Sequence, residues 1–130
     1  MKQLIILGCL VLTGCSILHP QAPFDSAEYS EINRLYTYAE VYKLDCIDTT
    51  KTKTNFAQLS LFGNLAFNYS QDLPYNDNTI RAVTSLNQIV QTANQRIQTG
   101  RHSPKFCELE LENIKQAAGT VKSAVAQRSR

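Results

Sequence analysis

The chain has 130 residues, of which 13 are lysine or arginine and 11 are aspartate or glutamate. This near balance of charge, with no basic stripe along any segment, argues against a nucleic-acid partner. The length is sufficient for one domain with its own core. We therefore expect a single small domain behind an N-terminal leader.

The leader occupies the first residues of the chain. Lys2 is followed by an apolar run from Leu4 to Leu12, which has the charge and the length of the first two regions of an export signal. The run is too short to cross a bilayer, which needs about 20 residues. It ends in the letters LTGC at residues 12–15, where an ordinary export signal carries a small residue at the cleavage site.

These four letters resemble the lipobox of bacterial lipoproteins. In that family the cysteine sulfur receives a diacylglycerol, the chain is cut before the cysteine, and the new amine is acylated with a fatty acid such as palmitate. The resemblance implies a signal peptide over residues 1–14 and lipidation of Cys15. Since each buried methylene contributes about 0.8 kcal/mol, three acyl chains would hold the protein at a membrane. The alternative is a plain secretory signal with a chance cysteine.

The residue after the lipobox bears on location. In enterobacterial lipoproteins an aspartate at this position favours retention in the inner membrane, and here the position holds Ser16. The resemblance therefore implies a lipid anchor in the outer membrane of a Gram-negative bacterium, with the domain on the periplasmic face. Residues 15–24 are expected to form a lipidated tether, because SILHPQAPF has two prolines and no periodic apolar pattern.

A helical periplasmic domain is predicted over residues 25–130. Its first helix is predicted from Ser26 to about Leu44, because the letters DSAE at residues 25–28 have the form of an N-cap with an acidic residue three positions on. Apolar residues then recur at helical spacing, ending at Cys46. The polar letters IDTTKTKT at residues 47–54 predict a loop, with Thr54 as the cap of the next element.

The segment at residues 55–69 is open to two interpretations. Its apolar residues alternate, and Gly63-Asn64 fits a hairpin turn. As a helix, the segment would be apolar on nearly every side, which is typical of a central, buried helix. We favour the helix and keep the hairpin as the alternative.

Two further helices follow. The letters QDLPYNDN predict a turn, with Asp77 or Asn78 as the cap of a third helix that ends near Thr99, and Gly100 follows it. A fourth helix is predicted after a Ser103 cap with proline in its first position. Charges suit the dipole of this helix, with acidic residues near its start and basic residues near its end: Glu108, Glu110 and Glu112, then Lys122, Arg128 and Arg130.

The cysteines test this order of helices. Cys9 leaves with the leader and Cys15 takes lipid, so Cys46 and Cys107 remain. Two cysteines in an oxidising compartment predict one disulfide, and two free thiols are the alternative. In an up-down order, the end of helix one and the start of helix four lie at the same end. The predicted fold is all-α, a small up-down four-helix bundle with one disulfide joining these two points.

The sequence contains no motif typical of a catalytic, metal-binding or phosphate-binding site. His19 and His102 lack a histidine or carboxylate partner at metal-ligand spacing. Neither a Gly-x-Ser-x-Gly motif nor a glycine-rich phosphate loop occurs. We therefore predict a protein that is not an enzyme, with no catalytic residues, no metal site and no cofactor.

Apolar residues on outer faces predict a protein partner instead. On helix one, Tyr38 and Val41 fall outside the buried stripe, and on the second segment Leu61 and Phe62 belong to a face that a small bundle leaves uncovered. Tyrosine is enriched at protein interfaces, so these four residues are the candidate partner-binding site. The alternative is that they are isolated apolar surface residues, which are common.

A second resemblance combines three features. The lipobox, the letters VYKLDC that end helix one, and the opening SPKFCELELENI of the last helix are together similar to the type II secretion pilotins. Those are small helical outer-membrane lipoproteins with one disulfide between the first and last helices, and they hold an amphipathic segment of a secretin. The resemblance implies a non-enzymatic binding module or adaptor with a protein partner in the envelope. The alternative is a prophage- or plasmid-type structural or exclusion lipoprotein of unknown partner.

Overall fold

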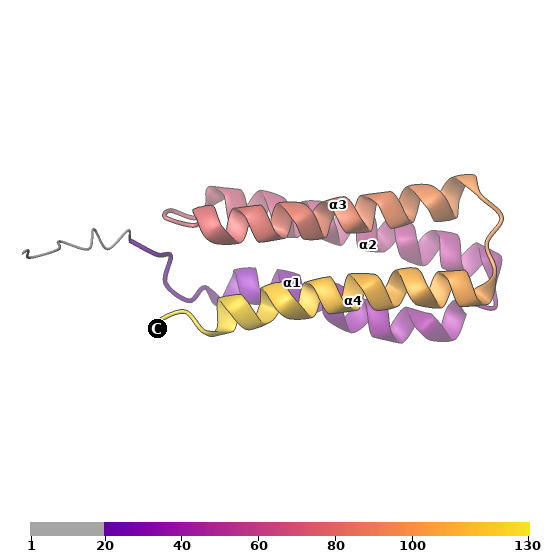
Figure 1. Ribbon diagram of the computed structural model, residues 1–130, viewed down its shortest axis with the longest axis horizontal. Coiled ribbons are helices and arrows are strands. Elements are labelled where there is room, and N and C mark those ends of the chain that lie inside the picture. The colour runs from indigo at the N-terminus through magenta and orange to yellow at the C-terminus, as the bar shows by residue number, and fades with distance from the viewer. Residues whose placement is uncertain (1–19) are drawn as a thin grey trace, which may run out of the picture.

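A computed structural model describes residues 20–130, so the signal peptide at 1–14, Cys15 and residues 16–19 of the tether lie outside the described residues. Four helices, α1 (Ser26–Val41), α2 (Thr49–Asp72), α3 (Asp77–Thr99) and α4 (Pro104–Ala126), run alternately in opposite directions, and a 3-10 turn, η1 (Tyr42–Asp45), extends α1 (Figure 1). Residues 20–130 contain no strand. The predicted all-α up-down bundle is confirmed, and the hairpin at 55–69 is wrong.

The core is one continuous cluster to which all four helices contribute. Helix α1 packs most extensively on α4, and α2 on α3, while the α1–α2 and α3–α4 seams are looser. The fully buried large side chains lie 3, 4, 7 or 11 residues apart along each helix, spacings that keep them on one face: Ile32 and Leu35, Phe56 and Leu59, Val83, Leu86, Val90 and Ile97, and Leu111, Ile114 and Val125. Among the helices of residues 20–130, none is both long and apolar enough to cross a membrane.

Amide and hydroxyl side chains hold the tight α2–α3 seam. The Gln91 side chain accepts a hydrogen bond from the Ser60 hydroxyl at 2.5 Å and donates to the Ser60 carbonyl at 2.9 Å. A Cβ atom at Gly63 would lie 2.7 Å from Asn87 Oδ1, so a larger residue there would have to displace the Asn87 side chain. This seam explains why residues 55–69 are helical, because their polar residues find partners on a neighbouring helix.

Two of the predicted helix starts are confirmed. The Asp25 carboxylate accepts a hydrogen bond from the Glu28 backbone N–H at 2.7 Å. The Ser103 hydroxyl accepts from the Phe106 N–H at 3.1 Å, and Pro104 occupies the first position of α4. Each cap satisfies a backbone donor that the first helical turn leaves without a partner.

The loop predicted at residues 47–54 is wrong. Helix α2 begins at Thr49, with Asp48 as its cap, and Thr54 lies inside the helix. Threonine is a weak helix former, but tertiary contacts offset this: the Thr52 hydroxyl donates to the Asp45 carbonyl at 3.1 Å, and the Asn55 amide donates to the Asp45 carboxylate at 2.9 Å. Tertiary packing has overridden local propensity here.

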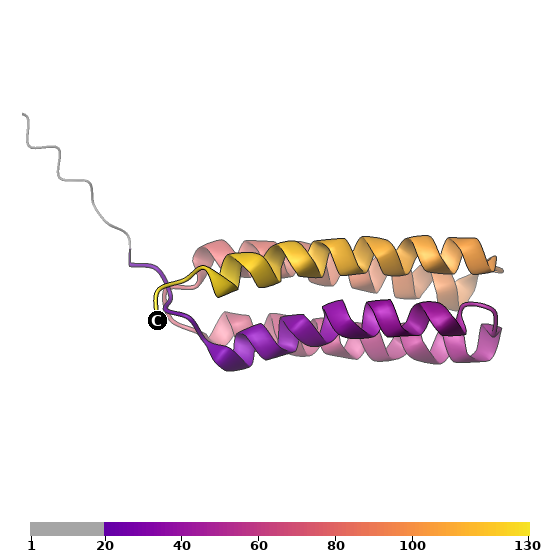
Figure 2. The same ribbon diagram turned by 90° about the horizontal axis from the view of Figure 1, so that it is seen from below.

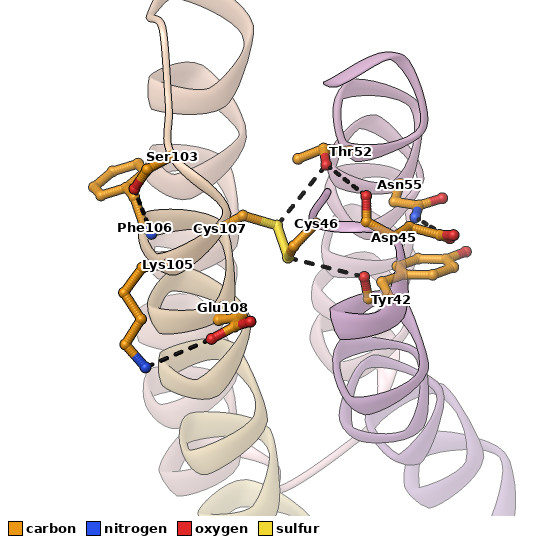
Figure 3. The surroundings of a disulfide bond; sticks show 10 residues. All are labelled: Tyr42, Asp45, Cys46, Thr52, Asn55, Ser103, Lys105, Phe106, Cys107 and Glu108. Atoms are coloured by element: carbon orange, nitrogen blue, oxygen red, sulfur yellow. Dashed lines mark hydrogen bonds and ion pairs between the residues drawn. A yellow bond between two sulfur atoms is a disulfide. The ribbon is translucent and has the colours of Figure 1, made fainter. Parts of the chain in front are cut away.

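The predicted disulfide is present between Cys46 and Cys107, whose Cα atoms are 5.6 Å apart (Figure 3). Cys46 follows η1 and Cys107 lies in the first turn of α4, so the bond joins the end of helix one to the start of helix four as predicted. The buried Thr52 hydroxyl lies 3.9 Å from the Cys107 sulfur. We call this end of the bundle the disulfide end.

The opposite end, which we call the tether end, holds a buried ion pair. Arg128 Nη1 lies 2.6 Å from Glu28 Oε2, and the two side chains are 2% and 1% exposed. The Ser70 hydroxyl and the Asn76 amide donate to the other carboxylate oxygen at 2.7 and 2.8 Å. Arg128 Nη2 donates to the Asn76 side chain and to the Thr79 hydroxyl. The network therefore connects α1, α2, α3, the α2–α3 turn and the segment that follows α4.

This network corrects two details of the sequence interpretation. The cap of α3 is Asn76 rather than Asp77 or Asn78, and its side chain makes no capping bond because it is bound to Glu28 and Arg128. Arg128 lies beyond the end of α4 and pairs with Glu28, so it is not a solvated partner of the helix dipole.

Candidate docking face on helices α1 and α2

The predicted partner-binding residues lie on α1 and α2 around an aromatic cluster. The Tyr38 ring centroid is 5.3 Å from that of Phe62 and 5.3 Å from that of Tyr42. Phe62 is buried, whereas Tyr38, Val41 and Leu61 are between 38% and 55% exposed. The structure therefore brings Tyr38 of one helix against Phe62 of the other, with Phe62 as the floor and its neighbours at the surface.

One residue of this face was missed. Leu65 is 43% exposed, one helical turn after Leu61 on α2. The spacing of four residues is the available signal for it. The central, buried helix expected for this segment is wrong, because α2 is one of four outer helices, and the uncovered face expected at Leu61 extends to Leu65. We define the docking face as Tyr38, Val41, Leu61 and Leu65.

The aromatic cluster beneath the docking face is held in place from several sides. The Tyr42 hydroxyl donates a hydrogen bond to the Gln58 side chain at 2.5 Å, and burial raises the pKa of the Tyr42 phenol. The Arg34 guanidinium lies 5.2 Å from the Phe62 ring centroid, a cation–π geometry. Two tilted ring pairs and one such contact hold the side chains of the face in a fixed arrangement.

Other exposed apolar residues gather at the disulfide end. Leu44 and Ile47 are the most exposed large apolar side chains among residues 20–130, and Leu109 is exposed as well. Leu44 and Leu109 line a hollow of about 370 Å³ between α1 and α4, together with Lys43, Lys105, Glu108 and Glu112.

The α3–α4 seam contains a hollow with a volume of about 690 Å³. Its lining is mostly amide and hydroxyl side chains, including Gln88, Asn113 and Thr120, and Arg96 pairs with the buried Glu110 at 2.9 Å on its wall. Of the three glutamates assigned to the dipole at the start of α4, Glu110 is thus buried and paired with a residue of α3. Binding pockets for small molecules are usually more apolar and more enclosed.

Charged pairs join α1 to α4 near the disulfide end. Glu40 accepts from Lys43 and Lys115, both at 2.7 Å, and Lys43 also reaches Glu112 at 2.5 Å. The hydrogen bonds from Lys115 and then Lys43 hold the pKa of the Glu40 carboxyl at about 2, and that from Lys43 lowers the pKa of Glu112. All four groups are at the surface, so they act as a salt-sensitive brace along the seam.

Within residues 20–130, no group of three or more histidine, cysteine, aspartate or glutamate side chains is placed to hold a metal ion. His102 lies in the α3–α4 connection, and neither of its ring nitrogens has a hydrogen-bond partner. The other histidine of the sequence, His19, lies outside the described residues. Comparison of the chain with protein-family models, with curated proteins and with solved structures gives no match.

Proposed function

We propose that this protein is an outer-membrane lipoprotein whose helical domain is a non-enzymatic protein-binding module, an adaptor of the pilotin type. Two independent features support the proposal. The letters LTGC at residues 12–15 match the lipobox at all four positions, which provides an anchor through Cys15. The docking face provides a surface for a partner, and it is the observation that carries the binding part of the proposal.

The chemistry of the docking face indicates the kind of partner. Tyr38, Val41, Leu61 and Leu65 place an aromatic ring and three aliphatic side chains along two helices. An amphipathic helix of another envelope protein could lay an apolar stripe along them, with anchors spaced three or four residues apart. Because the aromatic floor is already packed, binding would order few side chains, which lowers the entropic cost of association.

Tyr38 is the expected hot spot of this face. Its ring is half-exposed, rigid and backed by Phe62 and Tyr42, and tyrosine is among the residues whose truncation costs most at interfaces. Removing the ring would lose about 2 kcal/mol of binding free energy, which corresponds to roughly a thirty-fold weaker complex.

The test is capture of a partner from detergent-solubilised envelopes by the lipidated chain, compared with Tyr38→Ala and Leu61→Ala. The matched control is Ile89→Ala, which truncates an exposed apolar residue on α3, outside the docking face. We expect a protein that is captured by the wild type and by Ile89→Ala and lost with Tyr38→Ala. Equal capture by wild type and Tyr38→Ala would contradict the proposal.

Two controls separate binding from folding and from anchoring. Tyr38→Ala should leave the helical circular dichroism spectrum unchanged, since the ring lies at the surface; a loss of helicity would show instead that Tyr38 is part of the core. Cys15→Ala should release the protein from the outer-membrane fraction. Retention of that variant would contradict the lipid anchor while leaving the docking face untouched.

A further inference from the structure

The tether end collects three segments that are distant in sequence. The described N-terminal segment, the α2–α3 turn and the C-terminus meet there, opposite the α1–α2 and α3–α4 connections (Figure 2). The Ala22 N–H donates to the Tyr75 carbonyl at 3.0 Å, and the Phe24 N–H donates to the Ser129 carbonyl at 2.8 Å. The segment that precedes α1 is therefore hydrogen-bonded to the bundle at Ala22 and at Phe24.

The α2–α3 turn presents apolar residues at this end. It consists of Leu73, Pro74 and Tyr75, of which Pro74 and Tyr75 are exposed, and the Tyr75 side chain is 64% exposed. Tyr75 has a φ of 58°, a left-handed conformation that is unfavourable for a residue with a side chain by about 1 kcal/mol. It persists because its carbonyl is bound by Ala22 and the next residue, Asn76, is locked in the buried network.

The length of the tether limits which part of the domain can approach a membrane. Ala22 is seven residues from Cys15, so the intervening chain spans at most roughly 25 Å. Helix α2 alone has 24 residues and is about 36 Å long. With an acylated Cys15, the tether end stays close to the lipid surface, and the disulfide end can reach that surface only if the bundle lies flat.

We propose that the tether end is a membrane-contact surface, in which Tyr75 and the rest of the 73–75 turn rest in the headgroup region of the phospholipid layer, so that the bundle stands on end. This inference rests on the lipid anchor of the proposed function. Tyrosine favours this region because its ring is apolar and its hydroxyl remains hydrated. The docking face and the disulfide end then project away from the membrane, where a partner helix can reach them.

The contact is apolar rather than electrostatic. Asp72 and Asp77 flank the turn, and Arg128 is already neutralised by Glu28. The Arg130 guanidinium lies over the Phe24 ring, 5.4 Å from its centroid. Anionic lipids should therefore not strengthen the contact, because the exposed Asp72 and Asp77 offset the exposed Arg81 and Arg130.

The test uses the absence of tryptophan from the sequence. Tyr75→Trp introduces a single tryptophan at the turn, and Ile47→Trp introduces a matched one at the disulfide end, where Ile47 is 85% exposed. The lipidated full chain of each variant is incorporated into phosphatidylcholine vesicles that carry spin-labelled headgroups. We expect blue-shifted emission and quenching for Tyr75→Trp, and the emission of a hydrated, unquenched indole for Ile47→Trp.

Vesicle flotation separates the two proposals. If the chain floats with vesicles but Tyr75→Trp is not quenched, or Ile47→Trp is quenched equally, the membrane contact is overturned and the anchor stands. If the chain does not float at all, the anchor and this inference both fail. Quenching of Tyr75→Trp that appears only after phosphatidylglycerol is added would overturn the apolar basis of the contact.

Discussion

At the disulfide end, the chain just after η1 is joined to α4 by the covalent bond between Cys46 and Cys107, whereas at the tether end α1 is joined to the segment after α4 by the buried ion pair of Glu28 and Arg128. The charged residues of the brace around Glu40, near the disulfide end, lie at the surface. The Glu28–Arg128 pair lies inside, with both oxygens of the Glu28 carboxylate hydrogen-bonded.

The covalent bond and the ion pair contribute to the fold in different ways. A disulfide stabilises chiefly by restricting the unfolded chain. A buried ion pair gains little net free energy, because removing two charges from water costs about as much as their attraction returns. The ion pair instead disfavours other arrangements of the chain, because a bundle in which Arg128 does not contact Glu28 would bury a charge without a partner. We infer that the network fixes how the C-terminus and the tether segment seat on the bundle.

The largest expected effect comes from removing one partner of the ion pair. Arg128→Met leaves the Glu28 carboxylate buried without its counter-charge, and such changes typically cost about 3–5 kcal/mol. Because a domain of this size has a total stability of about 5–15 kcal/mol, the loss is severe. Denaturant unfolding of the domain measures it.

The companion variant sharpens this prediction. Replacing both partners, as Glu28→Met with Arg128→Met, removes the buried charge along with its partner and should recover much of the lost stability. Amide hydrogen exchange in Arg128→Met should accelerate in the first turn of α1 and the last turn of α4, and remain slow around Cys46. Loss of protection at both ends equally would show that the ends do not act separately.

Removing the disulfide is expected to have the second-largest effect. The bond closes a loop with a sequence separation of 61 residues, for which chain entropy gives about 4 kcal/mol, and measured losses are typically about 2–4 kcal/mol. Cys46→Ser should therefore lower the melting temperature of the domain under non-reducing conditions. A melting temperature equal to that of the wild type would mean that the disulfide does not stabilise this bundle.

The smallest effect concerns the surface brace and depends on pH. The pKa of Glu40 is held at about 2, below its ordinary value of 4.5, so the folded state favours the ionised form. The resulting stability is present above pH 4.5 and is lost as the pH falls toward 2. Because Glu40 is at the surface, the effect is small and is screened by salt.

Thermal unfolding between pH 5 and pH 2 checks this contribution. Glu40→Gln should flatten the decline in melting temperature over that window, and added salt should narrow its difference from the wild type. Glu108→Gln is the control, because Glu108 pairs only with Lys105 on its own helix. An equal flattening in Glu108→Gln would assign the pH dependence to general charge repulsion and not to the α1–α4 brace.

The sequence predicted the features that depend on local spacing or on residue type. The spacing of apolar residues predicted the helices, and residue type predicted the caps at Asp25 and Ser103. Two cysteines in an oxidising compartment predicted the disulfide between Cys46 and Cys107. The start of α2 could not be predicted in this way. Thr52 and Asn55 contact Asp45, and nothing in the threonine-rich sequence indicates these contacts.

The tether-end network was also beyond sequence reasoning. Glu28 has the position of a capping-box residue and Arg128 that of a helix-dipole partner, and one hundred residues separate them. Nothing local indicates that they meet. The docking face was found in part, since Tyr38, Val41 and Leu61 are exposed as the periodicity indicated, while Phe62 is buried beneath them and Leu65 was overlooked.

The proposed membrane-tethered adaptor depends most directly on the fate of Cys15. Intact-mass spectrometry of the native protein, purified from membranes, tests it. A chain that begins at residue 15 and carries the added mass of a diacylglycerol and one further acyl group is the predicted result. A chain that begins at Met1, or that is cut elsewhere and carries no lipid, would contradict the account.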